Sequence, residues 1–187
     1  DAEKDWSIEF QKIIPQKHLY QDKIILLSDG FYSGISPEKM DMSQEEWRRL
    51  SLVIRREHEA THYFTERVLG SSRNNLLDEI LADYMGITAA NGSFRMDWFL
   101  KFMGLERVDK YRRGGRLENY RGKPPLTEKS FLVLQKLVWQ AALNLEIFDK
   151  NIGANMRQKI DGDTNILLHL AKLTLEDLAN GEALVTL

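Results

Sequence analysis

The sequence contains no cysteine. This absence excludes disulfide bonds and thiolate metal ligands, so any bound metal must be held by histidine and carboxylate side chains. The absence is also typical of proteins from a reducing compartment, which favours the cytoplasm. Beyond that, the sequence leaves the compartment unknown.

Excess charge and long apolar runs are also missing. The formal net charge is -2 and the pI is about 6.1, which gives no general reason to expect nucleic acid or an anionic membrane as a partner. No apolar run approaches the ~20 residues that a membrane-spanning helix needs, so we expect a soluble chain without a membrane span. The chain begins at Asp1 without a charged-then-apolar leader, as expected of a mature form, a fragment or a trimmed piece.

The length of 187 residues is sufficient for a sizeable core. We expect one domain over residues 1–187, either complete or the C-terminal part of a longer protein. Helical periodicity dominates the chain and predicts a mostly α fold. The exception is a short β-branched and leucine run at residues 23–27, which predicts at most a small β element before a Ser-Asp-Gly turn.

Residues 43–70 carry the signals of one long helix. Ser43 and Glu46 form a capping box at its start, and Gly70 offers a stop. Apolar or small residues recur at helical spacing and predict the buried face. They are Trp47, Leu50, Ile54, His58, Thr61, Thr65 and Val68.

Within this helix, His58-Glu59-Ala60-Thr61-His62 forms an H-E-x-x-H motif. Two histidines four positions apart lie one above the other on the same face, so both imidazoles can reach one metal ion. Glu59 points about 100° round the helix, near enough to hold a metal-bound water without filling a ligand position. Chance would produce this motif in a chain of this composition roughly one time in a hundred. The motif therefore supports a metal site only together with the predicted helix and a third, acidic ligand.

A second helix offers a third, acidic ligand. The polar residues 71–75 predict a turn in which Asn75 caps a helix with Asp78 as its third residue. Glu79 follows one turn into this helix, and Asp83 lies one turn further on the same face. If the two helices are antiparallel, Glu79 comes within a side chain's reach of the histidines. Asp83 then lies near the far nitrogen of a ligand histidine.

Together, His58-Glu59-x-x-His62 and Glu79-x-x-x-Asp83 resemble the gluzincin branch of zinc metallopeptidases, the thermolysin-like and related enzymes. The E-I-L-A-D form of the second motif also resembles the E-x-x-A-D of membrane-embedded bacterial and prenyl-protein peptidases. The resemblance implies a zincin-like helical domain in which His58, His62 and Glu79 bind Zn²⁺, Glu59 is the general base and Asp83 orients a histidine. The sequence that flanks the motif also resembles an uncharacterised bacterial domain of unknown function.

This ligand set predicts a catalytic site, because three protein ligands leave the fourth position of zinc to water. The metal lowers the pKa of that water towards about 7 and polarises a carbonyl, while Glu59 takes the proton and returns it to the leaving amine. We therefore interpret the chain as a zinc-dependent enzyme that hydrolyses a peptide or related amide bond in a peptide or protein substrate. The alternatives are a zinc-binding structural module without catalysis, and an all-helical interaction domain whose basic loop contacts an acidic partner. The oligomeric state is left open.

Residues 105–126 break the helical pattern and carry seven basic residues against three acids. One interpretation is a solvated loop. The other is a lid over the cleft, in which Arg116, Tyr111 or Tyr120 donates to a substrate carboxylate or an oxyanion. His169 is a further candidate for that role, although a histidine in such an apolar stretch is more often part of the core.

The remaining segments are predicted to be helical. A short helix is expected at residues 5–14, and an aromatic stripe at residues 94–103 predicts a core helix. A longer helix is expected at residues 127–149, followed by a break at 151–153. Residues 155–180 are expected to be helical with an interruption at 161–163.

Overall fold

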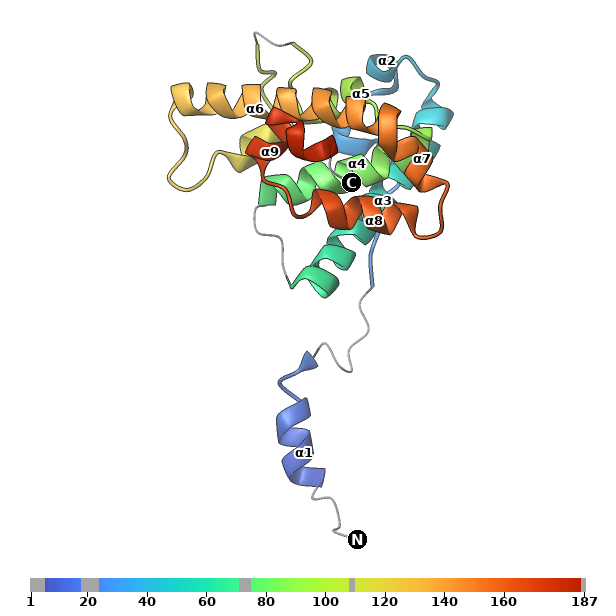
Figure 1. The fold of residues 1–187 in the computed structure, drawn as a ribbon, viewed down its shortest axis with the longest axis vertical. Coiled ribbons are helices and arrows are strands. Elements are labelled where there is room, and N and C mark those ends of the chain that lie inside the picture. Colours follow the sequence, from blue (N-terminus) through green and yellow to red (C-terminus); the bar gives the residue numbers. More distant parts are fainter. Residues whose placement is uncertain (1–5, 18–23, 71–74, 108–109, 186–187) are drawn as a thin grey trace.

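The computed structural model describes residues 6–17, 24–70, 75–107 and 110–185 of the chain. In these ranges the protein is built from helices and contains no strand, which confirms the predicted mostly α fold (Figure 1). The α-helices are α1 (Trp6–Ile13), α2 (Pro37–Met40), α3 (Gln44–Leu69), α4 (Asn75–Asn91), α5 (Met96–Met103), α6 (Glu128–Phe148), α7 (Ala154–Arg157), α8 (Gly162–Leu170) and α9 (Leu175–Asn180). The shorter turns are η2 (Tyr32–Gly34), η3 (Arg116–Tyr120), the π-helical η4 (Asp149–Gly153) and η5 (Glu182–Val185).

The β element predicted near residues 23–27 was wrong for residues 24–27, which have no regular secondary structure, while Lys23 lies outside the described residues. Ile24 and Leu26 are 81% and 89% exposed. A strand requires a neighbouring strand for its backbone hydrogen bonds, and the described ranges offer none. The segment instead links the core to α1, which lies apart from the other helices in Figure 1.

The long helix α3 has the ends that its sequence predicts. The Ser43 hydroxyl accepts a hydrogen bond from the amide of Glu46 at 3.2 Å, and Gly70 ends the helix with a φ of 76°. The predicted stripe is buried from Trp47 through Thr65. Val68 is 55% exposed, so the buried face stops about one turn before the helix does.

Helices α3 and α4 pack closely side by side in opposite directions. The contacts show this direction, because His58 meets Asp83 while His62, one turn later on α3, meets Asp78. Gly86 of α4 permits the close approach, since a Cβ there would lie 2.7 Å from the carbonyl oxygen of Ile54. The two motif helices therefore face each other across one seam.

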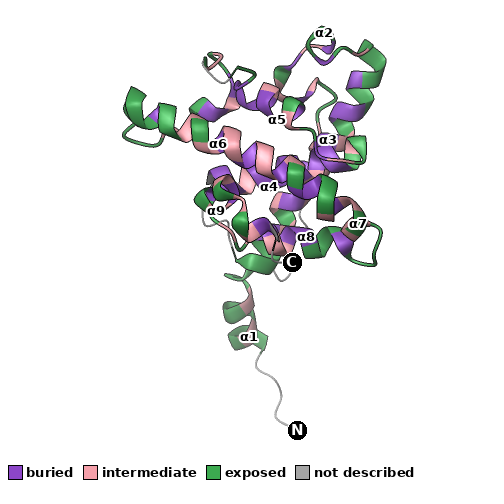
Figure 2. Cartoon of the chain, turned by 45° about the horizontal axis from the view of Figure 1, so that its top comes forward, coloured by how far each residue is buried: buried purple, intermediate pink, exposed green. Residues whose placement is uncertain are grey.

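A single cluster of apolar side chains surrounds this pair, drawn from segments between Tyr32 and Leu184. Figure 2 shows the buried residues lining the inner faces of the larger helices and the exposed surface of α1. The aromatic stripe predicted as core is buried as expected, and consists of Phe94, Trp98, Phe99, Phe102 and Met103. Phe102 packs edge-on against Tyr32 with ring centroids 5.0 Å apart, which connects the core to the segment before α3.

The chain remains helical from Glu128 to Arg157, so the break predicted at residues 151–153 was wrong. The π-helical η4 joins α6 to α7 instead. Asp149, at the start of η4, is fully buried and accepts hydrogen bonds from the Tyr84 hydroxyl at 2.6 Å, the Phe94 amide at 2.8 Å and the Arg157 guanidinium. These bonds tie η4 to α4, to the segment before α5 and to α7, and single π-helical turns occur mostly inside longer helices, as here.

This same stretch, Glu128–Arg157, is the one helix in the described ranges that is long and apolar enough to cross a membrane by length and composition. This finding differs from the expectation, drawn from the absence of a long apolar run, of a chain without a membrane span. One such helix is only a weak indication, because the core helix of a soluble protein passes the same test. Here α6 contributes core residues, including Val138 and Leu145.

An interruption is present, but it lies at residues 158–161, slightly before the predicted 161–163, and residues 162 and 163 already belong to α8. Asp161 has a φ of 58°, in the left-handed region, and α8 begins at the next residue. A Cβ on Gly162 would lie 2.0 Å from the carbonyl oxygen of Met156. This turn therefore depends on glycine at position 162.

Candidate metal centre

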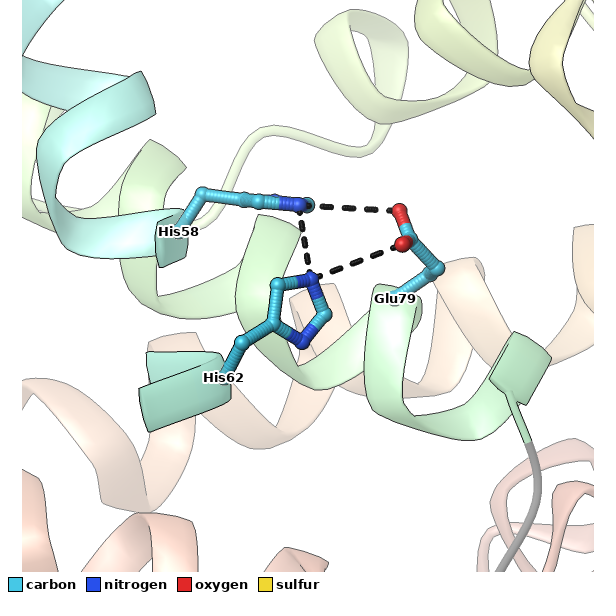
Figure 3. Close-up of side chains that lie close together, drawn as sticks. All are labelled: His58, His62 and Glu79. Atoms are coloured by element: carbon cyan, nitrogen blue, oxygen red, sulfur yellow. Dashed lines mark hydrogen bonds and ion pairs between the residues drawn. The ribbon is translucent and has the colours of Figure 1, made fainter. Parts of the chain in front are cut away.

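Three side chains from α3 and α4 converge on one point. Figure 3 shows His58 and His62 of α3 and Glu79 of α4 pointing toward one another. The two histidine Nε2 atoms are 3.0 Å apart. The carboxylate of Glu79 lies 3.6 Å from the Nε2 of His58 and 3.4 Å from that of His62. Among the described residues, these three form the group whose possible ligand atoms all lie within 4.8 Å of one another.

These separations suit a tetrahedral zinc ion. With bonds of about 2.0–2.1 Å to nitrogen and oxygen, neighbouring ligand atoms around zinc lie roughly 3.3 Å apart. Each of the three measured separations is within a few tenths of an ångström of that value. Small side-chain shifts would therefore place one nitrogen from each histidine and one oxygen of Glu79 around a single ion.

The outer nitrogen of His58 is held by two acceptors. Its Nδ1 lies 3.0 Å from Asp83 Oδ1 and 2.8 Å from the hydroxyl of Tyr32, which itself donates to Asp83 at 2.6 Å. A carboxylate beside Nδ1 favours the tautomer with the hydrogen on that nitrogen. The lone pair of His58 is then on Nε2, which faces His62 and Glu79.

His62 is held in the same way by Asp78, which was not among the predicted site residues. Its Nδ1 lies 2.5 Å from Asp78 Oδ2, and the hydroxyl of Thr65 donates to Asp78 Oδ1 at 3.0 Å. The hydrogen bonds that His62 donates to Asp78 and Glu79 raise its pKa to about 10. Without a metal, the His62 ring is therefore an imidazolium between two carboxylates.

Arg116 of η3 contacts the cluster from outside the helix pair. Its guanidinium donates to the Tyr32 hydroxyl at 3.0 Å and to Asp83, and lies 3.9 Å from the carboxylate of Glu79. Burial raises the pKa of Asp83, but the charge of Arg116 and the hydrogen bonds from His58 and Tyr32 outweigh it, so the pKa is lowered. Asp83 is thus ionised although it is fully buried.

Tyr120, at the other end of η3, also reaches the cluster. Burial raises the pKa of its hydroxyl, and so does its hydrogen bond with Glu79. The hydroxyl therefore stays protonated and can donate a hydrogen bond at the edge of the site. Arg116 and Tyr120, both candidates from their place in the basic segment 105–126, therefore lie at the site although they are far from the ligands in the sequence.

The fixed charges around the cluster do not balance without a cation. Asp78, Glu79 and Asp83 carry three negative charges, and their positive partners within the described ranges are Arg116 and the protonated ring of His62. One negative charge is left over. A divalent ion that displaced the proton of His62 would bring the sum to zero, because the nitrogen that carried the proton becomes a ligand.

Two predicted site residues are not in this network of contacts. Glu59 is exposed on α3, and in the described part of the structure it makes no hydrogen bond or ion pair with the cluster. The ring of His169 stacks on Phe148 with centroids 6.3 Å apart and bonds to the backbone of Ala183. The structure therefore places His169 among α6, α8 and η5, with no described contact to the metal ligands.

The fold and the cluster define a mostly helical protein with a candidate metal centre of two histidines and one carboxylate. The model of DUF7005, described as a family of unknown function, matches residues 1–182, and the chain belongs to that family. No curated protein and no solved structure matches the chain.

Proposed function

We propose that this protein is a zinc-dependent metallopeptidase that hydrolyses a peptide or related amide bond. The observation that carries the proposal is the convergence of His58, His62 and Glu79 at separations that suit one tetrahedral ion. The H-E-x-x-H motif on α3 and the E-x-x-x-D motif on α4 also have the order found in gluzincins, which the sequence resembles.

Each residue of the site has a chemical role in this proposal. A bound zinc ion supplies Lewis acidity, which lowers the pKa of a water towards about 7 and polarises a carbonyl. Glu59 is assigned as the general base that takes a proton from the attacking water and returns it to the leaving amine. Tyr120 is assigned as a donor to the oxyanion, because its protonated hydroxyl lies beside Glu79. Asp83 orients His58 through Nδ1.

The number of ligands favours a catalytic site over a purely structural one. Structural zinc sites are closed by four protein ligands, whereas catalytic sites leave one position to water. In the described ranges the cluster has three members, and the side chains of His62 and Glu79 are 26% and 22% exposed. Solvent therefore reaches two of the three proposed ligands.

The remaining alternative is an interaction domain that binds no metal. It leaves the excess negative charge of the site unexplained, and elemental analysis distinguishes it directly. Protein purified without a metal-affinity step should contain about one zinc ion per chain, and His62→Ala and Glu79→Ala should each lose it. A metal-free wild-type protein after dialysis against excess zinc would overturn the proposal.

Catalysis is tested by Glu59→Gln, which removes the proposed base but no ligand. With a library of fluorescence-quenched peptides as probe, the wild-type protein should cleave, and the variant should keep zinc but lose turnover by at least about a hundredfold. Glu57→Gln makes the same change two residues earlier on α3 and should cleave normally. Undiminished hydrolysis by Glu59→Gln would exclude this base assignment. A zinc-loaded wild type that cleaves no peptide would favour the structural module.

A further inference from the structure

A concave pocket of about 850 Å³ lies between α2, α5 and the loop that follows α5. Six of its lining residues are basic and one is acidic. The basic residues are Lys39, Lys101, Arg107, Lys110, Arg112 and Arg113. This concentration contrasts with the whole chain, whose formal net charge is -2. None of the metal ligands lines this pocket.

Most of this positive charge has no carboxylate partner among the residues that the structure describes. The one acidic lining residue, Glu106, is already paired with Arg112 at 2.6 Å. Four lining cations make no ion pair within the described residues: Lys39, Lys101, Lys110 and Arg113. Like charges around one concavity repel each other, so a bound anion would lower the electrostatic energy of the pocket.

One wall of the pocket is already fixed in the absence of a ligand. The guanidinium of Arg112 donates to the carbonyl of Lys101 at 2.6 Å, and the Tyr111 hydroxyl donates to the carbonyl of Gly115 at 2.6 Å. The ends of the loop also touch, because a Cβ on Gly115 would lie 2.5 Å from the Cα of Gly104. Ligand binding would therefore cost little conformational entropy in this wall, because the wall is already ordered.

The size of the pocket points to a compact anion. A volume of about 850 Å³ lies within the range of small-molecule sites and corresponds to a space roughly 10–12 Å across. An extended acidic peptide spreads its charges, since side chains on one face recur only about every 7 Å. Linked phosphate groups concentrate three or four negative charges in a much smaller volume, and arginine and lysine both bind phosphate well.

We propose that this pocket binds a small ligand that carries two or more linked phosphate groups. Lys110 and Arg113 of the loop and Lys39 and Lys101 of the neighbouring helices supply the positive charge, while Arg112 is held in the wall. This binding is independent of the proposed hydrolysis, because no residue is shared between the two sites.

The test is calorimetric titration of the full chain with inorganic triphosphate. The double variant Lys110→Gln/Arg113→Gln removes two pocket charges from exposed side chains. The matched control, Lys129→Gln/Lys136→Gln, removes two exposed lysine charges from α6. The wild type and the control should bind triphosphate equally, with affinity that falls as salt rises, and the pocket variant at least tenfold more weakly. Zinc content is measured before and after, so that chelation of the metal by triphosphate is not counted as binding.

Parallel titrations with ATP and with a hexaglutamate peptide complete the design. Binding of either triphosphate or ATP, weakened selectively in the pocket variant, supports the proposal, and their relative affinities show whether a nucleoside contributes. The absence of binding by both phosphate compounds would overturn it, as would equal weakening in both variants. Tighter binding of hexaglutamate would also overturn it, because the ligand would then be an acidic polypeptide.

Discussion

Asp78 and Glu79 are consecutive residues of α4, yet they lie against opposite nitrogens of the His62 ring. The carboxylate of Asp78 is 2.5 Å from Nδ1, and that of Glu79 is 3.4 Å from Nε2. Consecutive side chains on a helix point about 100° apart, and the imidazole ring fits into the angle between them. One pair of neighbouring acids therefore both orients this histidine and completes the ligand set.

Replacing Asp78 should weaken zinc binding. Asp78→Ala removes the acceptor that holds Nδ1 of His62, and changes of this kind typically cost about 10- to 100-fold in metal affinity. Asp78→Asn keeps a hydrogen-bond acceptor and should lose less. Zinc affinity measured by competition with a chromogenic chelator checks both, with Asp163→Ala on the exposed part of α8 as a control that should bind normally. Unchanged affinity in Asp78→Ala would show that Asp78 does not position the ligand.

Zinc binding should release a proton from His62. The neighbouring carboxylates raise the pKa of this ring to about 10, so near pH 7.5 the metal-free protein holds a proton that zinc must displace, and about one proton should leave per ion bound. Calorimetry in buffers with different ionisation enthalpies measures this number. Asp78→Ala should release clearly less.

The same pKa shift predicts how the stability of the metal-free protein depends on pH. Because the folded pKa lies above the ordinary value of 6.5, the contribution of His62 is fully present below pH 6.5 and is lost as the pH rises towards 10. Thermal unfolding of chelator-treated protein across this range should show a falling melting temperature. His62→Ala should show a smaller fall over the same range, and equal slopes would contradict the prediction.

Removing Arg116 should destabilise the fold. Arg116→Met leaves the fully buried carboxylate of Asp83 without its ionic partner, and breaking a buried pair in this way costs about 3–5 kcal/mol. Urea unfolding near neutral pH measures the loss, and Arg113→Met, an exposed neighbour, should be close to the wild type. The difference should narrow in acid, since the lowered pKa of Asp83 makes its stabilising contribution present at neutral pH and lost as the pH falls.

Separating the two motif helices should impair the metal site without touching a ligand. Gly86→Ala places a Cβ 2.7 Å from the carbonyl oxygen of Ile54, so α4 must move away from α3 at a cost of about 1–3 kcal/mol. Zinc affinity should fall together with stability. Ala89→Gly, at an exposed position of α4, should lower stability by about 1 kcal/mol through helix propensity alone. If both variants bind zinc equally well, the distance between α3 and α4 does not determine the zinc affinity.

Sequence patterns failed where the outcome depended on distant neighbours. The apolar run at residues 24–27 suits a strand by composition, but no described strand lies beside it. A break was predicted at residues 151–153, but these residues belong to the π-helical η4, whose buried Asp149 accepts hydrogen bonds from the Tyr84 hydroxyl and the Phe94 amide. Neither result follows from local propensity, because a strand needs a neighbouring strand and both of these donors lie far from Asp149 in the chain.

The sequence by itself determined the two motif helices and the placing of His58, His62 and Glu79 on them, because helical spacing and capping are local properties. Only the tertiary structure decided which groups hold those ligands. Tyr32 precedes α3 and Arg116 lies beyond α5, and the packing of the core brings both to Asp83. Asp78 likewise acquires its role only when α4 packs antiparallel against α3. Such contacts join residues that are far apart in the sequence, and the spacing of residues along the chain does not show which of them lie close together after folding.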